Sequence, residues 1–148
     1  MDARAVLACM AYVDLNPIRA AMASTPEESD YTSVQERIKH PHIDCLAPFK
    51  DQADDGIPVN LKDYLQLVDW SGREIKNHKR GYIPTTTPPI LRRLQMGAAP
   101  VLGYLARDDL TLPSAIGPID KLRTFAESVG RKFIKGHALG RRLCPERV

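Results

Sequence analysis

The feature that most constrains the fold is a long apolar run that ends at Asn16-Pro17. Residues 3–15 contain no glycine or proline, and their apolar side chains recur at helical spacing on nearly every side. These side chains are Val6, Leu7, Ala8, Cys9, Met10, Ala11, Val13 and Leu15. Such a helix needs burial on more than one side, and no strand pattern precedes it to form a covering sheet. We therefore expect this helix to lack a cover within the chain and to dock loosely, self-associate or seek a partner.

The rest of the chain predicts a mainly α-helical fold of short helices and long loops, because no strong strand pattern occurs. A capping box at Ser33 begins one helix, Ser71-Gly72 interrupts another, and Gly130 ends the clearest late helix. The helices expected along the chain span about residues 3–15, 17–22, 34–39, 61–70, 73–77, 91–95, 100–107 and 118–129, with a last short one beginning at Phe133-Ile134.

Chain length and loop composition indicate how the sequence divides. A chain of 148 residues suits one ordinary domain or two small ones. Residues 41–60 are rich in proline, aspartate and glycine, which is typical of a linker or an exposed loop. We therefore expect an N-terminal unit at residues 1–40, a linker at 41–60 and a helical unit at 61–148.

Tyr12 lies near the end of the apolar run, in the same predicted helix as Asn16. Tyr12 and Asn16 are about one helical turn apart, so they share a face of the first helix. A rigid helix suits a phenol that must be aimed at phosphorus. From the spacing alone, an ordinary tyrosine at the edge of the core and an asparagine cap before Pro17 is the favoured alternative.

The full string from Tyr12 to Ala20, Tyr-Val-Asp-Leu-Asn-Pro-Ile-Arg-Ala, resembles the closing motif of single-tyrosine HUH transposases, particularly the REP-associated type. That family usually reads Tyr-x-x-x-Asn-Pro-x-(Arg/Lys)-Ala at this point. The likeness covers about residues 3–39, including the loop from Pro26 to Ser33. Beyond His40 the chain resembles, more weakly, the C-terminal extension of some bacterial proteins described as transposases.

The resemblance implies an activity in DNA transposition. In the family the tyrosine nicks single-stranded or hairpin element ends through a 5′-phosphotyrosine link, and the polar residue four positions on assists a site for Mg or Mn. Carried over, Tyr12 is the nucleophile and Asn16 is the polar helper. The motif normally closes an α+β catalytic domain, so its position here implies a remnant of that domain followed by a small helical extension, with a missing N-terminal half or a homodimer as partner.

The metal ligands of the family are a His-hydrophobic-His pair on a strand before the tyrosine, and this chain has none before Tyr12. His40-Pro41-His42 lies after Tyr12, and its proline is unsuited to a central strand. Two histidines also need further ligands. We therefore expect no metal site or other cofactor in this chain, and no cleavage of DNA by the chain alone.

Two basic clusters are candidates for DNA contact, with a solvated charged face as the alternative reading of both. Arg19 after the motif either contacts a phosphate or complements a helix end. The candidate DNA-binding residues are Arg19, Arg73, Lys76, Lys79, Arg80, Arg131, Lys132, Lys135, Arg141 and Arg142. The net charge of +3 permits nucleic-acid contact without requiring it.

Three widely spaced cysteines and no Cys-x-x-Cys pair predict a reduced, cytoplasmic chain without a zinc ribbon. Charged residues near the N-terminus and the lack of a long apolar segment argue against a signal peptide or a membrane span. Two alternatives to a transposase fragment stay open. One is a non-enzymatic helical DNA-binding or interaction module, and the other is a gene remnant without activity.

Overall fold

The computed structural model describes residues 2–40, 59–77, 88–107 and 113–145. Within these ranges the chain is helical and has no strand, which confirms the mainly α prediction. The helices are α1 (Ala3–Asp14), α2 (Asn16–Arg19), the 3-10 helix η1 (Pro26–Glu28), α3 (Ser33–Lys39), α4 (Leu61–Asn77), α5 (Pro89–Arg93), α6 (Ala98–Leu105), α7 (Ile119–Ser128) and α8 (His137–Leu143).

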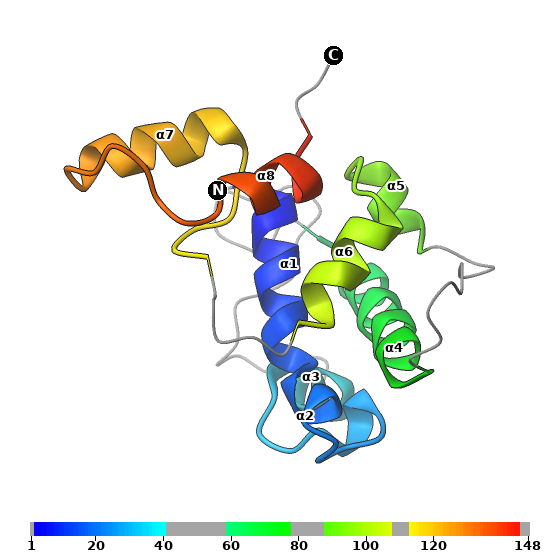
Figure 1. Cartoon of the computed structure of the whole chain (residues 1–148). Coiled ribbons are helices and arrows are strands. Elements are labelled where there is room, and N and C mark those ends of the chain that lie inside the picture. Colours follow the sequence, from blue (N-terminus) through cyan, green and yellow to red (C-terminus); the bar gives the residue numbers. More distant parts are fainter. Residues whose placement is uncertain (1, 41–58, 78–87, 108–112, 146–148) are drawn as a thin grey trace.

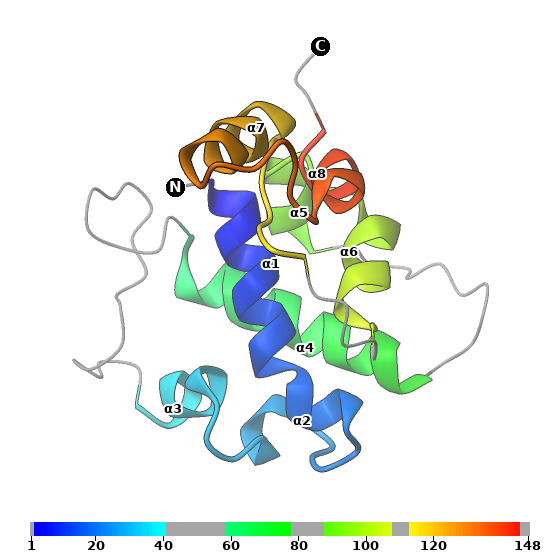
Figure 2. The same ribbon diagram turned by 60° about the vertical axis from the view of Figure 1, so that its left-hand side comes forward.

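Helix α1 runs through the middle of the molecule, with α2 and α3 at its C-terminal end and α7 and α8 near its N-terminal end (Figures 1 and 2). It begins where the Asp2 carboxylate accepts hydrogen bonds from the backbone N–H groups of Arg4 and Ala5, at 2.9 and 3.3 Å. That cap satisfies two of the four donors that every helix start leaves open.

The expectation that α1 lacks a cover is wrong. Leu7 and Ala11 are fully buried, and α1 packs against both α4 and α6. Figure 2 shows α4 crossing behind α1 and α6 lying along its other side. Two helices therefore supply the burial that we had assigned to a sheet, and the apolar character of α1 is no argument for missing structure. Each large side chain buried in this way stabilises the fold by about 1.5–3 kcal/mol.

The main hydrophobic core draws on both ends of the described chain. Leu7 and Leu15 of α1 belong to it, and so do Tyr64 of α4 and Leu143 of α8. Segments on the two sides of residues 41–60 thus contribute to one core. Most of the expected 41–60 linker lies outside the described residues.

Helix α4 continues through Ser71-Gly72, where the sequence had predicted an interruption. A Cβ at Gly72 would lie 3.2 Å from Cδ1 of Ile18 and 3.4 Å from Cδ2 of Leu15. Ser71 is fully buried beside it. The two small residues therefore mark a close approach of α4 to α1 and α2, and this packing offsets their poor helix propensity.

Helix α3 is capped one residue earlier than predicted. Thr32 Oγ1 accepts a hydrogen bond from the backbone N–H of Gln35 at 3.3 Å, whereas Ser33 uses its hydroxyl elsewhere. The last helix was also misplaced, because Ile134 is buried in the small core of α7 and α8 begins only at His137. Gly136 has a φ of +138°, a conformation that side chains other than glycine rarely adopt.

Helix α7 lies at the edge of the molecule, away from α4 (Figure 1). It ends near Gly130, as predicted, with a φ of +68° at that glycine. Its buried face forms a separate small cluster of Ile119, Leu122, Ala126 and Ile134. A Cβ at Gly140 of α8 would come within 2.6 Å of the carbonyl oxygen of Gly117, so this glycine allows α8 to dock against the segment before α7.

Candidate functional site

Tyr12 lies two residues before the end of α1, partly buried against the main core. On one side its ring faces Tyr104 of α6, with the ring centroids 5.2 Å apart and the planes inclined by 31°. The guanidinium carbon of Arg19 lies 3.8 Å from the Tyr12 ring centroid. Such a cation–π contact contributes on the order of 0.5–2 kcal/mol. The phenol is therefore held in one orientation by an aromatic ring and a cation.

Arg19 connects the motif residues to one another. Its guanidinium donates hydrogen bonds to the carbonyl oxygens of Tyr12 and Leu105, each at 3.0 Å, and to Oδ1 of Asn16 at 2.8 Å. Tyr12 and Leu105 lie in the last turns of α1 and α6, where helical carbonyls have no partner within their own helix. Of the two readings offered for Arg19, the complement to a helix end is thus realised, at two helices at once.

Asn16 is the first residue of α2 and is exposed. Its side chain caps no helix, since α2 has no side-chain cap hydrogen bond. It accepts from Arg19 instead. The structure thus brings together Tyr12, Asn16 and Arg19, three residues of one sequence string, through a single guanidinium group.

Tyr104 completes the surroundings of Tyr12. It is 4% exposed, and burial raises its pKa above the ordinary tyrosine value, with further contributions from Cys9 and Tyr12. Tyr104 therefore stays a neutral phenol next to Tyr12 at neutral pH. No sequence pattern around residue 104 had marked it as part of this site.

Asp14 is the second residue that sequence reasoning missed. It is 1% exposed, and its two carboxylate oxygens accept from the Ser33 hydroxyl at 3.0 and 2.9 Å. The hydroxyl of Tyr64, itself fully buried, donates to Oδ2 of Asp14. Burial, followed by the charge of Asp14, raises the pKa of Tyr64. These bonds join α1, α3 and α4 directly behind the Tyr12 motif. The sequence did offer one sign that Asp14 is special, because it is the only charged residue between Ala5 and Ile18.

The surroundings of Tyr12 do not fit the divalent metal that the resemblance implies. Asn16 Oδ1 already accepts from a cation, and the Asp14 carboxylate is buried and already accepts from Ser33 and Tyr64. His40 is exposed at the end of α3, and His42 lies outside the described residues. Across the described ranges no three or more His, Cys, Asp or Glu side chains are grouped closely enough to hold a metal ion.

The first predicted basic cluster is only partly described. Arg73 is exposed on α4 and pairs with Asp69 one turn earlier, so its charge is partly neutralised. Lys76 belongs to the last turn of α4. Lys79 and Arg80 lie outside the described residues.

The second cluster is exposed and lies on α8 and on the loop before it. Arg131, Lys132 and Lys135 come from the loop, and Arg141 and Arg142 from α8. Two of them line a hollow of about 590 Å³ beside the C-terminal half of α7. The lining residues are Arg123, Glu127, Gly130, Arg131, Lys132 and His137. Arg123, which the sequence analysis did not select, thus joins the basic cluster.

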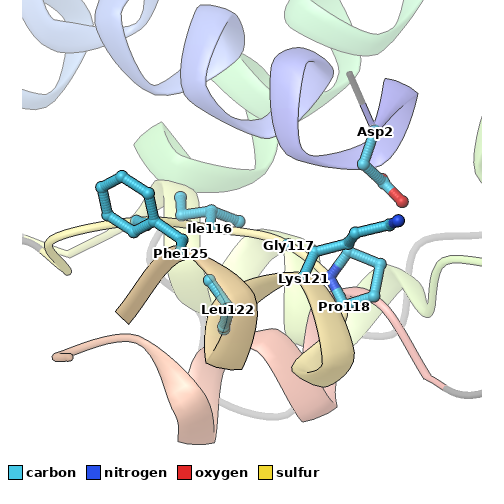
Figure 3. Close-up of a pocket in the computed structure, with 8 residues that line it drawn as sticks. Asp2, Ile116, Gly117, Pro118, Lys121, Leu122 and Phe125 are labelled. Carbon is cyan, nitrogen blue, oxygen red and sulfur yellow. The ribbon is translucent and has the colours of Figure 1, made fainter. Parts of the chain in front are cut away.

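A second hollow, of about 420 Å³, lies on another side of α7 (Figure 3). Leu122 and Phe125 of α7 face the loop residues Ile116 and Gly117 across it, and Asp2 lies at one end. Its walls are largely apolar, and its carboxylate already caps α1. The hollow holds one cation, Lys121, and one carboxylate, so it lacks the excess of positive charge that would favour a nucleic acid.

No protein-family model, no curated protein and no solved structure matches this chain. None of the helices in the described part of the chain combines the length and the apolar character needed to cross a membrane.

Proposed function

We propose that this chain is the tyrosine-bearing C-terminal part of a DNA transposase of the single-tyrosine HUH type. The observation that carries the proposal is the string from Tyr12 to Ala20, in which the Arg19 guanidinium lies over the Tyr12 ring and donates to the Tyr12 carbonyl oxygen and to Asn16 Oδ1.

In the proposed reaction the Tyr12 oxygen attacks a backbone phosphorus of single-stranded DNA. The Tyr12 oxygen forms a bond to the phosphorus, which stays attached to the 5′ oxygen of the downstream nucleotide. The bond from phosphorus to the 3′ oxygen breaks, and the phenol proton ends on the released 3′ hydroxyl. A divalent metal supplies charge stabilisation at the phosphate in the resembling family. Because the described residues do not fit that metal, we infer that this chain supplies one half of a divided active site. Tyr12 is its nucleophile, and Asn16 and Arg19 are positioning residues. A missing N-terminal half or a second copy of the chain is the partner that supplies the other half.

The second candidate is a non-enzymatic helical DNA-binding module. It is favoured by the saturation of the polar groups around Tyr12, and by the exposed cations of α8 and its preceding loop. Both functions share the contact with DNA, and they differ in whether Tyr12 lies against the DNA.

A cross-linking experiment separates the two. The photoreactive residue p-benzoylphenylalanine is placed at position 12 or, as control, at Tyr31, which is fully exposed. Each protein is irradiated with a labelled DNA hairpin bearing a single-stranded tail. The transposase proposal requires a DNA adduct from position 12 that exceeds the adduct from position 31. Equal or absent cross-linking at position 12, with intact DNA binding, favours the module.

An adduct assay without light tests the divided site. The unmodified chain, Mn and the same hairpin should give no covalent complex, because the described residues around Tyr12 include no group of metal ligands. A complex that Tyr12→Phe abolishes and Tyr31→Phe retains would show that the chain is catalytically complete.

A further inference from the structure

The hollow beside α7 has the size of a ligand site. Its volume of about 590 Å³ lies within the range of roughly 300–1,000 Å³ that is usual for small-ligand pockets. It is formed by Arg123 and Glu127 of α7, the loop at 130–132, and His137 at the start of α8. Three segments thus meet around one opening.

The charges that line this hollow are unbalanced. Arg123, Arg131 and Lys132 face it with a single carboxylate, Glu127. Over the described ranges, ion pairs are recorded for Arg4, Arg73 and Arg93, and none for these three cations. Three cations held near one another without partners repel each other and attract an anion. In nucleic acids, the anions that clusters of arginine and lysine bind are the backbone phosphates.

His137 lies at the same place. Its Nε2 atom is buried and has no hydrogen-bond partner in the described part of the chain. A buried polar atom without a partner is rare in native proteins. The Nε2 atom is enclosed by the chain itself, so His137 lines the hollow without offering this atom to a ligand.

An exposed aromatic ring adjoins this hollow in the sequence. Phe133 follows Lys132 directly and is 74% exposed. Exposed rings beside cations are how proteins hold single strands, because an unpaired base stacks on the ring while the backbone contacts the charges. In a duplex the bases are already stacked on each other, so a protruding ring selects for a single strand.

We propose that residues 123–137 form a binding site for single-stranded DNA, with a backbone phosphate in the hollow and an unpaired base on Phe133. This rests on the proposed function, since it names the part of the chain that holds the strand while Tyr12 addresses it. Arg123, Arg131 and Lys132 contact the phosphate, and Phe133 provides the single-strand preference.

The test is the affinity of the whole chain for a labelled oligothymidine of about 15 nucleotides and for a duplex of equal length, measured by fluorescence anisotropy. Phe133→Ala should weaken binding of the single strand by about tenfold and leave duplex binding unchanged, because one stacking contact is lost. Phe125→Ala is the matched control. Phe125 is also an exposed ring near α7, but it lines the other hollow (Figure 3), and its loss should change neither affinity.

A charge pair completes the design. Arg131→Ala with Lys132→Ala should weaken binding of the single strand more than Arg141→Ala with Arg142→Ala, which removes the same charge outside the hollow. Equal losses from the two charge pairs, or from Phe133→Ala and Phe125→Ala, would overturn the site. If the site variants bind as the unmodified chain does while position 12 still cross-links to DNA, this inference fails and the proposed function survives. If the unmodified chain binds neither oligonucleotide, both fail.

Discussion

The two ends of helix α1 differ in how their polar groups are used. At the C-terminal end, Arg19, Asn16, Asp14, Ser33 and Tyr64 are joined by hydrogen bonds within the chain. Near the N-terminal end, α7 carries cations without ion-pair partners in the described residues, and Phe125 and Val129 are 44% and 48% exposed. Figure 1 shows the first region at the bottom of the view, where α2 and α3 pack at the end of α1, and α7 at the upper left edge.

The C-terminal end of α1 therefore has a structural role, and the α7–α8 region presents exposed groups for binding. Saturated buried polar groups fix the relative positions of three helices, and their loss costs stability. Unpartnered exposed groups contribute little to stability, and they are free to bind. We therefore expect substitutions around α1 to change folding, and substitutions around α7 and α8 to change DNA binding.

The largest effect is expected in the core around α1. Leu7 is fully buried, and Leu7→Ala should lower the free energy of unfolding by about 2–5 kcal/mol, because the lost side chain leaves a cavity. Val13 is on the same helix but 64% exposed, and Val13→Ala should change stability by less than about 0.5 kcal/mol. Urea denaturation measures both. Similar small effects for the two variants would mean that α1 is not packed within the chain.

The next effect concerns the buried carboxylate. Asp14→Ala leaves the Ser33 and Tyr64 hydroxyls without their acceptor and should cost about 3 kcal/mol. The control is Glu27→Ala, an exposed acid on η1, which should cost less than about 0.5 kcal/mol. An Asp14→Ala protein as stable as the control would show that Asp14 does not stabilise the packing of α1, α3 and α4.

Alkaline pH should weaken the same region. The ordinary pKa of tyrosine is 10.0, and burial next to Asp14 raises the pKa of Tyr64 above it. The folded state then keeps a proton that the unfolded state releases, so stability is complete below pH 10 and falls as the pH rises above it. The slope for one such group is about 1.4 kcal/mol per pH unit. Tyr64→Phe should flatten the decline in pH-dependent denaturation, and an unchanged slope would contradict the assignment.

The smallest effect on folding and a clear effect on binding are expected on α8. Arg141→Ala with Arg142→Ala should leave stability nearly unchanged and lower the log–log salt slope of DNA binding by at most roughly 2, with a smaller loss of single-strand affinity than Arg131→Ala with Lys132→Ala. Arg73→Ala is a useful comparison, because Asp69 already pairs with that guanidinium. Binding that is independent of salt, or absent at about 50 mM salt, would favour a merely solvated face.

Local sequence patterns predicted most helices, because periodicity, caps and glycine stops act within a few residues. Ser71-Gly72 misled because its effect depends on Leu15 and Ile18, more than 50 positions away in the chain. The cover of α1 was missed for the same reason. A stripe on α4 is visible in the sequence, but its partner helix is not.

The candidate site was predictable only where its residues lie close together in the sequence. Tyr12, Asn16 and Arg19 were selected together, and they do lie together. Tyr104 and Tyr64 enter from distant helices, and nothing near them in sequence marks a partner. Arg123 was not among the predicted DNA-binding residues, and only the fold brings it beside Arg131 and Lys132.

The central claim is that α1 stabilises the fold and that the α7–α8 region binds DNA. Hydrogen exchange with and without the oligothymidine tests it most directly. Without DNA, residues 7–13 should be strongly protected at every protein concentration, and residues 119–128 should exchange faster. With DNA, protection should rise in residues 123–137 and stay constant in residues 7–11. Weak or concentration-dependent protection of residues 7–13, or protection by DNA that leaves residues 123–137 unchanged, would contradict the account.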